Sequence, residues 1–367
     1  MRAMLKFLLL SIAFVVALVG AFVAFVFFTE HKPKPIEPAE HQCRDGGRVL
    51  VKGEPFSLVS WNLQYAASRK HRFFYDGGEA VHVPPADVEE TVTGISKALA
   101  DAGAEINLLQ EIDRDSTRTG RLDQLTRYQA AIQPTCTSAA PYHLAYFVPK
   151  PTTNPLGRVH MALGILTTVA HDKATRHQLA LMNEPKVVQA LNLKRALLTA
   201  EVHVDGHTQP LAVAVTHLSA FSFGDGTLER QVAYLREWMD ARPPDQPWIL
   251  AGDFNLLPPG DDKNRLTTEA DLYADASNPI EALLPGHRTL FADQLAPENR
   301  TYLPFGASEP DRKIDYVFIG GPIDVLESRV MREHSALSDH LPVFGRLVIG
   351  AVPEDAATEV IPDKASP

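Results

Sequence analysis

The first constraint on this chain is an uncharged apolar run at residues 7–28, in which Ser11 carries the only hydroxyl group. About 20 apolar residues are enough to cross the hydrocarbon core of a bilayer, and such a segment must be helical to satisfy its own backbone polar groups. A cleavable signal peptide has a shorter apolar region that ends at small residues, whereas this run ends in Phe27 and Phe28. No cysteine follows directly, which argues against a lipoprotein anchor. We therefore predict an uncleaved transmembrane signal anchor within residues 1–30.

The charges beside this segment predict its orientation. Arg2 and Lys6 precede the apolar run, and positive residues favour the cytoplasmic side of a membrane. The expected protein crosses the inner membrane once, with the bulk of the chain on the periplasmic, extracytoplasmic side. Residues 31–54 are rich in Pro and Gly, which predicts a semi-rigid tether. Residues 351–367 are rich in Pro, Ala and acidic residues, which predicts a disordered tail.

Composition limits the functions open to the 367-residue chain. Its formal charge of −10 argues against a protein that binds nucleic acid mainly through a basic surface. That charge is compatible with an enzyme that meets a phosphate through a metal ion. The two cysteines, Cys43 and Cys136, are too few for a disulfide scaffold or a cysteine-based metal site. One bridge between them is an option in an oxidising compartment, but their spacing in the sequence does not indicate their distance.

Residues 55–350 form one region of catalytic-domain size, in which short apolar runs alternate with amphipathic segments. Apolar residues recur at helical spacing in the segments 88–102, 122–132 and 228–240. Strand-like runs occupy residues 56–61, 106–111, 161–166, 196–204, 211–215, 248–250, 314–319 and 341–344. Repeated strand–helix–strand units predict an α/β protein whose sheets are covered by helices.

Polar side chains stand at the ends of these apolar runs. Asp253 and Asn255 follow the run at 248–250, where Gly252 allows a sharp exit from the strand. The other polar residues at or beside the ends of runs are Asn62, Glu111, His217, Asp339 and His340. Taken singly, each has an alternative explanation as a turn former, a cap or a solvated charge. Asp315 differs because it stands inside an apolar run, where an unpaired carboxylate is costly.

As an ordered set, these residues resemble the endonuclease/exonuclease/phosphatase superfamily, which has the DNase I-like fold. Their order and approximate spacing agree over nearly all of residues 55–350, which is far more specific than any single motif. The motifs are Ser60-Trp61-Asn62, Leu109-Gln110-Glu111, Thr216-His217-Leu218, Gly252-Asp253-Phe254-Asn255, Arg312-Lys313-Ile314-Asp315-Tyr316 and Ser338-Asp339-His340. The resemblance implies a four-layer α/β sandwich, with two mixed β-sheets face to face between outer helices. It also implies Mg²⁺-dependent cleavage of a phosphoester.

The resemblance further implies which residues hold the metal and activate the water. Glu111 matches the family's metal-binding glutamate, an oxygen ligand suited to Mg²⁺, with Mn²⁺ as an alternative. Asp339 would lie beside the metal. Asp253 matches the residue that orients or deprotonates the attacking water, and Asn62 and Asn255 would hold the phosphate or the metal's shell.

Four more residues acquire roles through the same resemblance. His340 matches the histidine that contacts the scissile phosphate, and Asp315 would pair with it and fix its tautomer. His217 matches the histidine proposed to protonate the leaving oxygen. Arg195 more loosely resembles a phosphate-contacting arginine. The sequence departs from abasic-site endonucleases at Gln64, where they have an aspartate, and no catalytic tyrosine can be placed from residues 161–168.

We therefore expect a membrane-tethered, metal-dependent phosphodiesterase whose partner is a phosphoester, either nucleic acid or a phospholipid headgroup such as that of sphingomyelin. One alternative is a phosphomonoesterase acting on an inositol phosphate or sugar phosphate. Another is a non-catalytic extracytoplasmic binding module on the same fold. The candidate specificity loops are residues 64–85, where basic residues 69–72 precede aromatic residues 73–75, and residues 146–160. No obligate protein partner is inferred.

Overall fold

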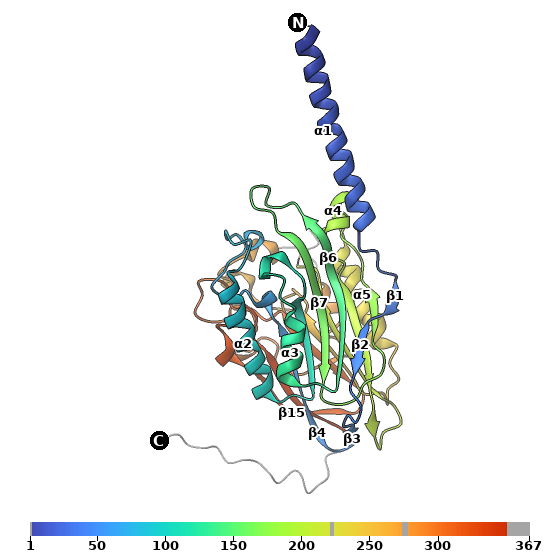
Figure 1. Cartoon of the computed structure of the whole chain (residues 1–367). Coiled ribbons are helices and arrows are strands. Elements are labelled where there is room, and N and C mark those ends of the chain that lie inside the picture. Colours follow the sequence, from blue (N-terminus) through green and yellow to red (C-terminus); the bar gives the residue numbers. More distant parts are fainter. Residues whose placement is uncertain (1, 221–223, 274–277, 351–367) are drawn as a thin grey trace.

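A computed structural model describes residues 2–220, 224–273 and 278–350, and the predicted tail at 351–367 lies outside them. The N-terminal helix α1 (Arg2–Thr29) projects from a body of sheets and helices (Figure 1). This helix is long and apolar enough to cross a membrane. The predicted apolar helix at the N-terminus is therefore confirmed.

Two seven-stranded sheets form the body. The strands are β1 (Ile36–Pro38), β2 (Glu40–Cys43), β3 (Leu50–Val51), β4 (Pro55–Asn62), β5 (Ile106–Asp113), β6 (Cys136–Val148), β7 (Gly157–Thr167), β8 (Thr175–Gln178), β9 (Ala196–Val202), β10 (Val204–Asp205), β11 (Leu211–His217), β12 (Trp248–Asp253), β13 (Arg288–Thr289), β14 (Asp315–Gly320), β15 (Ile323–Val330) and β16 (Val343–Ile349). One sheet has the order β1-β8-β9-β11-β12-β14-β13, and the other β15-β16-β4-β5-β7-β6-β2. The sheets are mixed, because β11 pairs parallel with β12 and β4 with β5, while their other neighbours are antiparallel.

Helices cover the outer faces of the two sheets. The helices of the body are α2 (Pro85–Ala102), α3 (Gln124–Ile132), α4 (Lys186–Leu191) and α5 (Thr227–Asp240). Apolar side chains of α5, such as Val232 and Leu235, pack on Leu250 and Phe318 of the first sheet. The opposite face of that sheet shares a core with the second sheet, α2 and α3. The four-layer α/β sandwich is therefore confirmed, with α2 and α3 on one side and α5 on the other (Figure 1).

The predicted tether at residues 31–54 is wrong for much of its length, because this segment joins both sheets. Strand β1 pairs antiparallel with β8, and β2 pairs antiparallel with β6. Strand β3 pairs parallel with β10. These short strands satisfy the backbone groups at sheet edges, which would otherwise be exposed. Their polar, proline-containing sequence lacks the apolar alternation by which strands are recognised.

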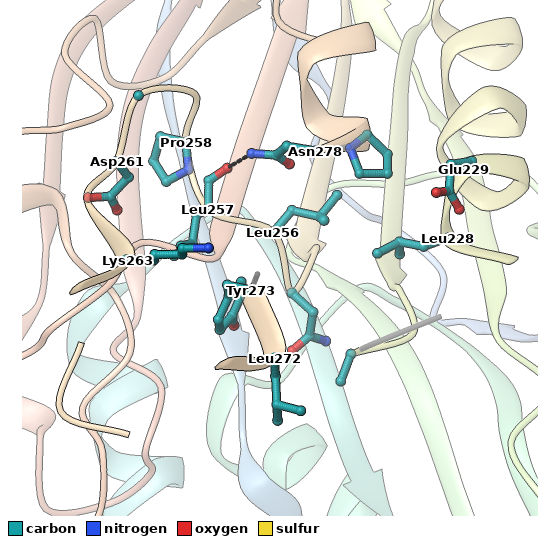
Figure 2. A pocket seen from close by; sticks show the side chains of 14 residues that line it. Leu228, Glu229, Leu256, Leu257, Pro258, Asp261, Lys263, Leu272, Tyr273 and Asn278 are labelled. Carbon is teal, nitrogen blue, oxygen red and sulfur yellow. Dashed lines mark hydrogen bonds between the residues drawn. The ribbon is translucent and has the colours of Figure 1, made fainter. Parts of the chain in front are cut away.

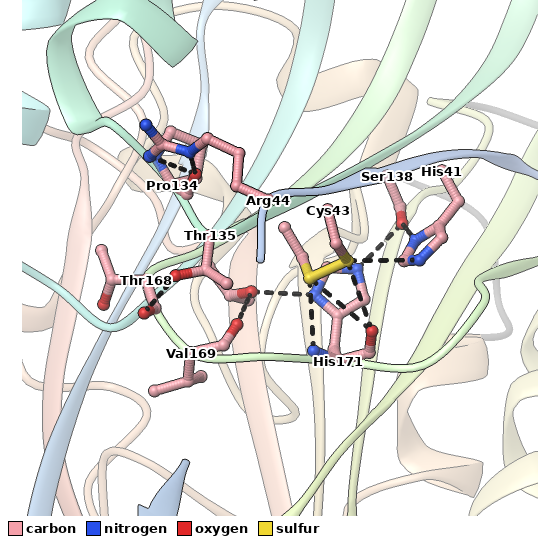
Figure 3. The surroundings of a disulfide bond; sticks show 11 residues. His41, Cys43, Arg44, Pro134, Thr135, Ser138, Thr168, Val169 and His171 are labelled. Carbon is pink, nitrogen blue, oxygen red and sulfur yellow. Dashed lines mark hydrogen bonds between the residues drawn. A yellow bond between two sulfur atoms is a disulfide. The ribbon is translucent and has the colours of Figure 1, made fainter. Parts of the chain in front are cut away.

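Cys43 and Cys136 form a disulfide bond (Figure 3). They are directly opposite each other in the β2–β6 pairing, so the bridge fastens the segment after α1 to an edge of the second sheet. The backbone amide of His171 donates a hydrogen bond to the Cys136 sulfur at 3.5 Å. The imidazole of His171 is hydrogen-bonded to Ser138 at 2.9 Å, and Ser138 also contacts His41 at 3.0 Å.

Candidate active site

The site is built at an edge where neighbouring strands end. His217 is the last residue of β11 and lies opposite Asp253, the last residue of the parallel strand β12. On the other side of β12, Asp253 lies opposite Asp315, the first residue of β14. Directly paired residues present their side chains to the same face of a sheet. The sheet therefore places these three titratable side chains in one row.

Unusual backbone conformations occur at several residues of the site. Glu111 and Asn255 have positive φ angles of 58° and 54°, a region that non-glycine residues seldom occupy. Gly252 has a φ of 151°, and a Cβ atom there would lie 2.0 Å from the carbonyl oxygen of Thr216. The glycine therefore lets β12 pass close to β11 immediately before Asp253.

His340 and Asp315 form a buried pair. The Nδ1 atom of His340 lies 2.9 Å and 3.1 Å from the two carboxylate oxygens of Asp315. The backbone of His340 is also held in place. The Trp61 indole donates a hydrogen bond to the His340 carbonyl at 2.9 Å, and the His340 amide donates one to the Ser338 hydroxyl. Opposite Nδ1, the Nε2 atom lies 3.5 Å from Asp253 Oδ2. Asp315 thus orients His340 so that its other nitrogen faces Asp253.

Asp253 is held by donors on both oxygens. Asn62 Nδ2 donates to Oδ2 at 3.0 Å, and the backbone amide of Asn255 donates to Oδ1 at 2.9 Å. The side-chain amide of Asn255 turns away and donates to the carbonyl of Leu218 at 3.2 Å. Asn62 is therefore a direct partner of Asp253, and Asn255 acts on it through its backbone.

His217 lies between Asp253 and Glu111. Its Nε2 is 3.3 Å from Asp253 Oδ2, and its Nδ1 is 3.6 Å from Glu111 Oε1. The hydroxyl of Tyr142 on β6 lies 3.2 Å from the same Nδ1. His217 therefore lies between the carboxylates of Asp253 and Glu111 and contacts both.

The two histidines prefer opposite charge states. Burial alone would lower the pKa of His340, but the Asp315 and Asp253 carboxylates outweigh it and raise the pKa well above its usual range. Burial lowers the pKa of His217 well below its usual range, and the cationic Arg195 and His340 add to this. Although two carboxylates lie near His217, we take it to be neutral, because Asp253 is already paired with cationic His340. At neutral pH the site therefore holds one imidazolium and one neutral imidazole.

These residues line one cleft with a volume of about 550 Å³. Burial, together with the neighbouring Asp339 carboxylate, raises the pKa of Glu111 to about 7. Burial raises the pKa of Asp76, a cleft residue outside the sequence motifs, to about 8, with further contributions from Asp339 and Glu111. Carboxylates that raise one another's pKa in this way repel each other when ionised. A bound divalent cation would remove that repulsion, so the donor set fits an oxygen-liganded metal such as Mg²⁺.

A second group of possible metal ligands lies at the same cleft, with Asp315 behind His340. Single ligand atoms of Asp253, Asp315 and His340 lie within 4.8 Å of one another. In this group, however, His340 already donates through Nδ1 to Asp315 and is predominantly cationic, so its nitrogens are not free lone-pair donors. The carboxylate oxygens of Glu111 and Asp339 therefore fit a metal ion better than this group does.

Arg195 also reaches the cleft. Its side chain is buried, and neither Nε nor Nη1 has a hydrogen-bond partner among the described residues. Its Cζ atom lies 5.5 Å from the centroid of the Tyr142 ring. A buried guanidinium with unpaired N–H groups is suited to a phosphate oxygen. The structure therefore brings all nine predicted site residues into one region, eight of them lining the cleft and Asp315 directly behind His340.

Tyr142 was missed because β6 itself was not recognised as a strand. Pro141 stands within this strand beside polar Thr137 and Ser138, and proline normally argues against an interior strand position. Arg118 was also missed: it pairs with Asp113 through both carboxylate oxygens and lies over the Tyr65 ring at 3.6 Å. No sequence pattern marks Arg118 as a cleft residue, because its segment resembles an ordinary polar loop.

A smaller hollow of about 140 Å³ adjoins the cleft (Figure 2). Asn255, Leu272 and Tyr273 line both. One wall is held by Asn278, whose side-chain amide donates to the carbonyl of Leu257 at 2.8 Å, as the dashed line in Figure 2 shows. The hollow therefore adjoins the cleft at Asn255, Leu272 and Tyr273.

Comparisons with known structures agree with this fold. A structure from Beutenbergia cavernae, described as an endonuclease/exonuclease/phosphatase, is 22% identical over 82% of this chain and 73% of its own, with a TM-score of 0.57. A family protein from Leptotrichia buccalis is 12% identical over 80% of this chain and 99% of its own, with a TM-score of 0.53. Humanized TDP2 of D. rerio is 14% identical over 80% of this chain and 98% of its own, with a TM-score of 0.50. A search of curated proteins finds no match.

At these identities the structural neighbours establish only the fold, so family membership is judged from the sequence. The sequence profile of the Endonuclease/Exonuclease/phosphatase family matches residues 59–340, which include every motif from Ser60 to His340. This chain belongs to the Endonuclease/Exonuclease/phosphatase family.

Proposed function

We propose that this protein is a Mg²⁺-dependent phosphodiesterase tethered to a membrane by α1. The observation that carries the proposal is the convergence of Asp253, His340 and Glu111 in one cleft, with His340 held by Asp315. A base, a cationic acid and a candidate metal ligand within one cleft match the needs of phosphoester hydrolysis. Family membership supports a phosphoesterase or nuclease-like enzyme in general.

Glu111 and Asp339 would hold the metal ion, with Mn²⁺ as an alternative to Mg²⁺. When bound, such an ion neutralises negative charge on the phosphate as the transition state forms. Arg195, through its unpaired N–H groups, would contact a phosphate oxygen from another side. Asn62 would keep Asp253 oriented through the bond that it donates to Oδ2.

The reaction itself transfers two protons. Asp253 accepts a proton from a water molecule as the water oxygen bonds to phosphorus. The phosphorus–oxygen bond to one alcohol breaks, and His340 donates the proton that the leaving oxygen takes up. His340 suits this role because it is predominantly cationic, whereas neutral His217 is placed to orient Asp253 through Nε2. The products are a phosphomonoester and a free alcohol.

The proposal is tested with the purified full chain and bis(p-nitrophenyl) phosphate, with and without Mg²⁺. We expect hydrolysis that requires the metal and is much faster than that of p-nitrophenyl phosphate, the monoester. In Glu111→Gln the shape is kept and the charge is lost, so activity should fall steeply and be partly restored by extra Mg²⁺. Preference for the monoester would favour a phosphomonoesterase instead, and inactivity toward both esters would favour a binding module.

A further inference from the structure

Helix α1 docks on the rim of the active-site cleft. The ring centroids of Phe22 on α1 and Phe147 on β6 are 6.5 Å apart. At the end of the helix, Glu30 forms an ion pair with Lys194 at 3.4 Å, and Val26 is fully buried against the body. Helix α1 also packs against α4, which lies beside its base in Figure 1. The anchor is thus held against the body at its last turns.

The neighbours of these contact residues line the cleft. Phe147 contacts α1, and the next residue, Val148, lines the cleft. Lys194 contacts Glu30, and the residues on either side of it, Leu193 and Arg195, line the cleft. The same two chain segments therefore contact helix α1 and form one wall of the cleft.

The length of the apolar run places this rim at the membrane surface. A hydrocarbon core of about 30 Å requires about 20 helical residues at about 1.5 Å each, so residues 7–28 are needed nearly in full. Phe22 precedes Phe28 by six residues, which is about 9 Å along the helix. Because Phe147 contacts Phe22, Phe147 must lie at or below the level of the lipid headgroups when α1 spans the bilayer.

The side chains on this rim suit that position. Tyr146 is 53% exposed and Val188 of α4 is 46% exposed, and aromatic and apolar side chains are favoured at a bilayer interface. The guanidinium of Arg158 lies 4.5 Å from the centroid of the Tyr146 ring. Lys150 and Lys186 are exposed on the same two segments, and lysines near a membrane attract anionic lipids.

We propose that the cleft opens onto the membrane that holds α1 and that its substrate is the phosphodiester of a phospholipid headgroup. This inference rests on the proposed phosphodiesterase function. A headgroup in the same leaflet would reach Arg195 and Asp253 across the rim while its acyl chains remain in the bilayer. A nucleic acid would have to approach between the body and an anionic membrane surface, and the chain itself has a formal charge of −10.

Membrane depth can be measured without any activity. The full-length Phe147→Trp variant is reconstituted into vesicles of phosphatidylethanolamine and phosphatidylglycerol that contain a doxyl-labelled quencher lipid. We expect strong quenching of its added fluorescence. The matched control is Val325→Trp on β15, because Val325 and Phe147 are each 37% exposed and β15 lies far from α1 (Figure 1). The native Trp61, Trp238 and Trp248 are buried and form a constant background. Equal quenching of the two variants would overturn the proposed orientation.

Substrate class is measured on the same vesicles. Phe147→Ser should slow hydrolysis of vesicle phospholipid by about ten-fold. It should leave hydrolysis of soluble bis(p-nitrophenyl) phosphate within about two-fold of wild type, since Phe147 is outside the row formed by His217, Asp253 and Asp315. Leu326→Ser on β15 should change neither rate. Loss of both activities to the same extent, or faster cleavage of soluble DNA or RNA than of lipid, would contradict the lipid substrate. Failure to cleave any diester would contradict the phosphodiesterase itself, while the quenching result would still decide the orientation.

Discussion

His340 and His217 stand on either side of Asp253, and their surroundings give them opposite charge states. His340 is 2.9 Å from Asp315 and 3.5 Å from Asp253, and these carboxylates hold the pKa of its imidazole high. His217 is buried beside cationic neighbours, which hold its pKa low. Two residues of the same type can therefore act as proton donor and as positioning group, respectively.

These assignments predict different responses to the leaving group. His340→Ala should slow hydrolysis of an alkyl phosphodiester by about 100-fold or more, but that of a nitrophenyl ester much less, because nitrophenolate leaves without a proton. His217→Ala should slow both esters to a similar extent, since it would disturb the orientation of Asp253. Rates over a series of leaving groups provide the measurement. A strong leaving-group dependence in His217→Ala, and none in His340→Ala, would assign the proton donor to His217, as the family resemblance implies.

The pKa of Asp253 predicts how kcat/KM depends on pH. Burial raises the pKa of its carboxyl group, and a general base acts only when it is ionised. At saturating metal, kcat/KM should therefore rise with pH through a pKa above the ordinary aspartate value of about 4. Asp253→Asn should lower kcat by about 100-fold to 10,000-fold and lose this rising limb. A rising limb of unchanged position in Asp253→Asn would mean that another group is the base.

At the scale of the elements, the sequence predicts the central strands well and the edges poorly. The runs that become β4, β5, β11 and β12 are buried and apolar and end in polar residues, so both the strand and its functional end are visible. Strand β6 contains Pro141, which hides it from recognition as a strand. Strands β1 and β2 are short and polar because they lie at the sheet edges, where one side has no neighbouring strand. The contact of Tyr142 with His217 could not be predicted from the sequence, because the two residues are 75 positions apart and lie on two different sheets.

The disulfide bond joins the edge strand β2 to its neighbour β6. Its two cysteines are 93 residues apart in the sequence, and a bridge that closes a loop of that size typically contributes about 3–5 kcal/mol by restricting the unfolded chain. Replacing both cysteines by alanine should lower the free energy of unfolding by about that amount, measured by denaturant titration. A reducing agent should destabilise the wild-type protein and leave the double variant unchanged. Two reactive thiols in the denatured, non-reduced wild-type protein would contradict the bridge.

At the scale of the whole molecule, the sandwich was predicted through the family resemblance that the ordered motifs carry, whereas the alternation of apolar and amphipathic runs alone predicted only an α/β protein. The position of α1 could not be predicted in this way. It depends on contacts such as Phe22 with Phe147 and Glu30 with Lys194, which link the anchor to distant parts of the chain. No pattern within the apolar run distinguishes a helix that lies against the body from one that extends freely.

The charges Arg2 and Lys6 predict that the body lies outside the inner membrane. Protease added to intact spheroplasts should therefore digest the chain beyond α1, while a cytoplasmic marker protein remains whole. The N-terminal segment should still be present in the mature protein by mass, because the run lacks a suitable cleavage site. Protection of the full-length chain until the spheroplasts are lysed would contradict this orientation.

The most direct test of the central claim, attack of water on phosphorus, is hydrolysis of a phosphodiester in ¹⁸O-labelled water with Mg²⁺. Mass spectrometry of the products locates the label. With Asp253 activating the water and His340 protonating the leaving oxygen, we expect one ¹⁸O atom in the phosphate-containing product and none in the alcohol. Label in the alcohol would mean that a carbon–oxygen bond breaks instead, and the absence of any hydrolysis would contradict the assignment of this cleft as a phosphoesterase site.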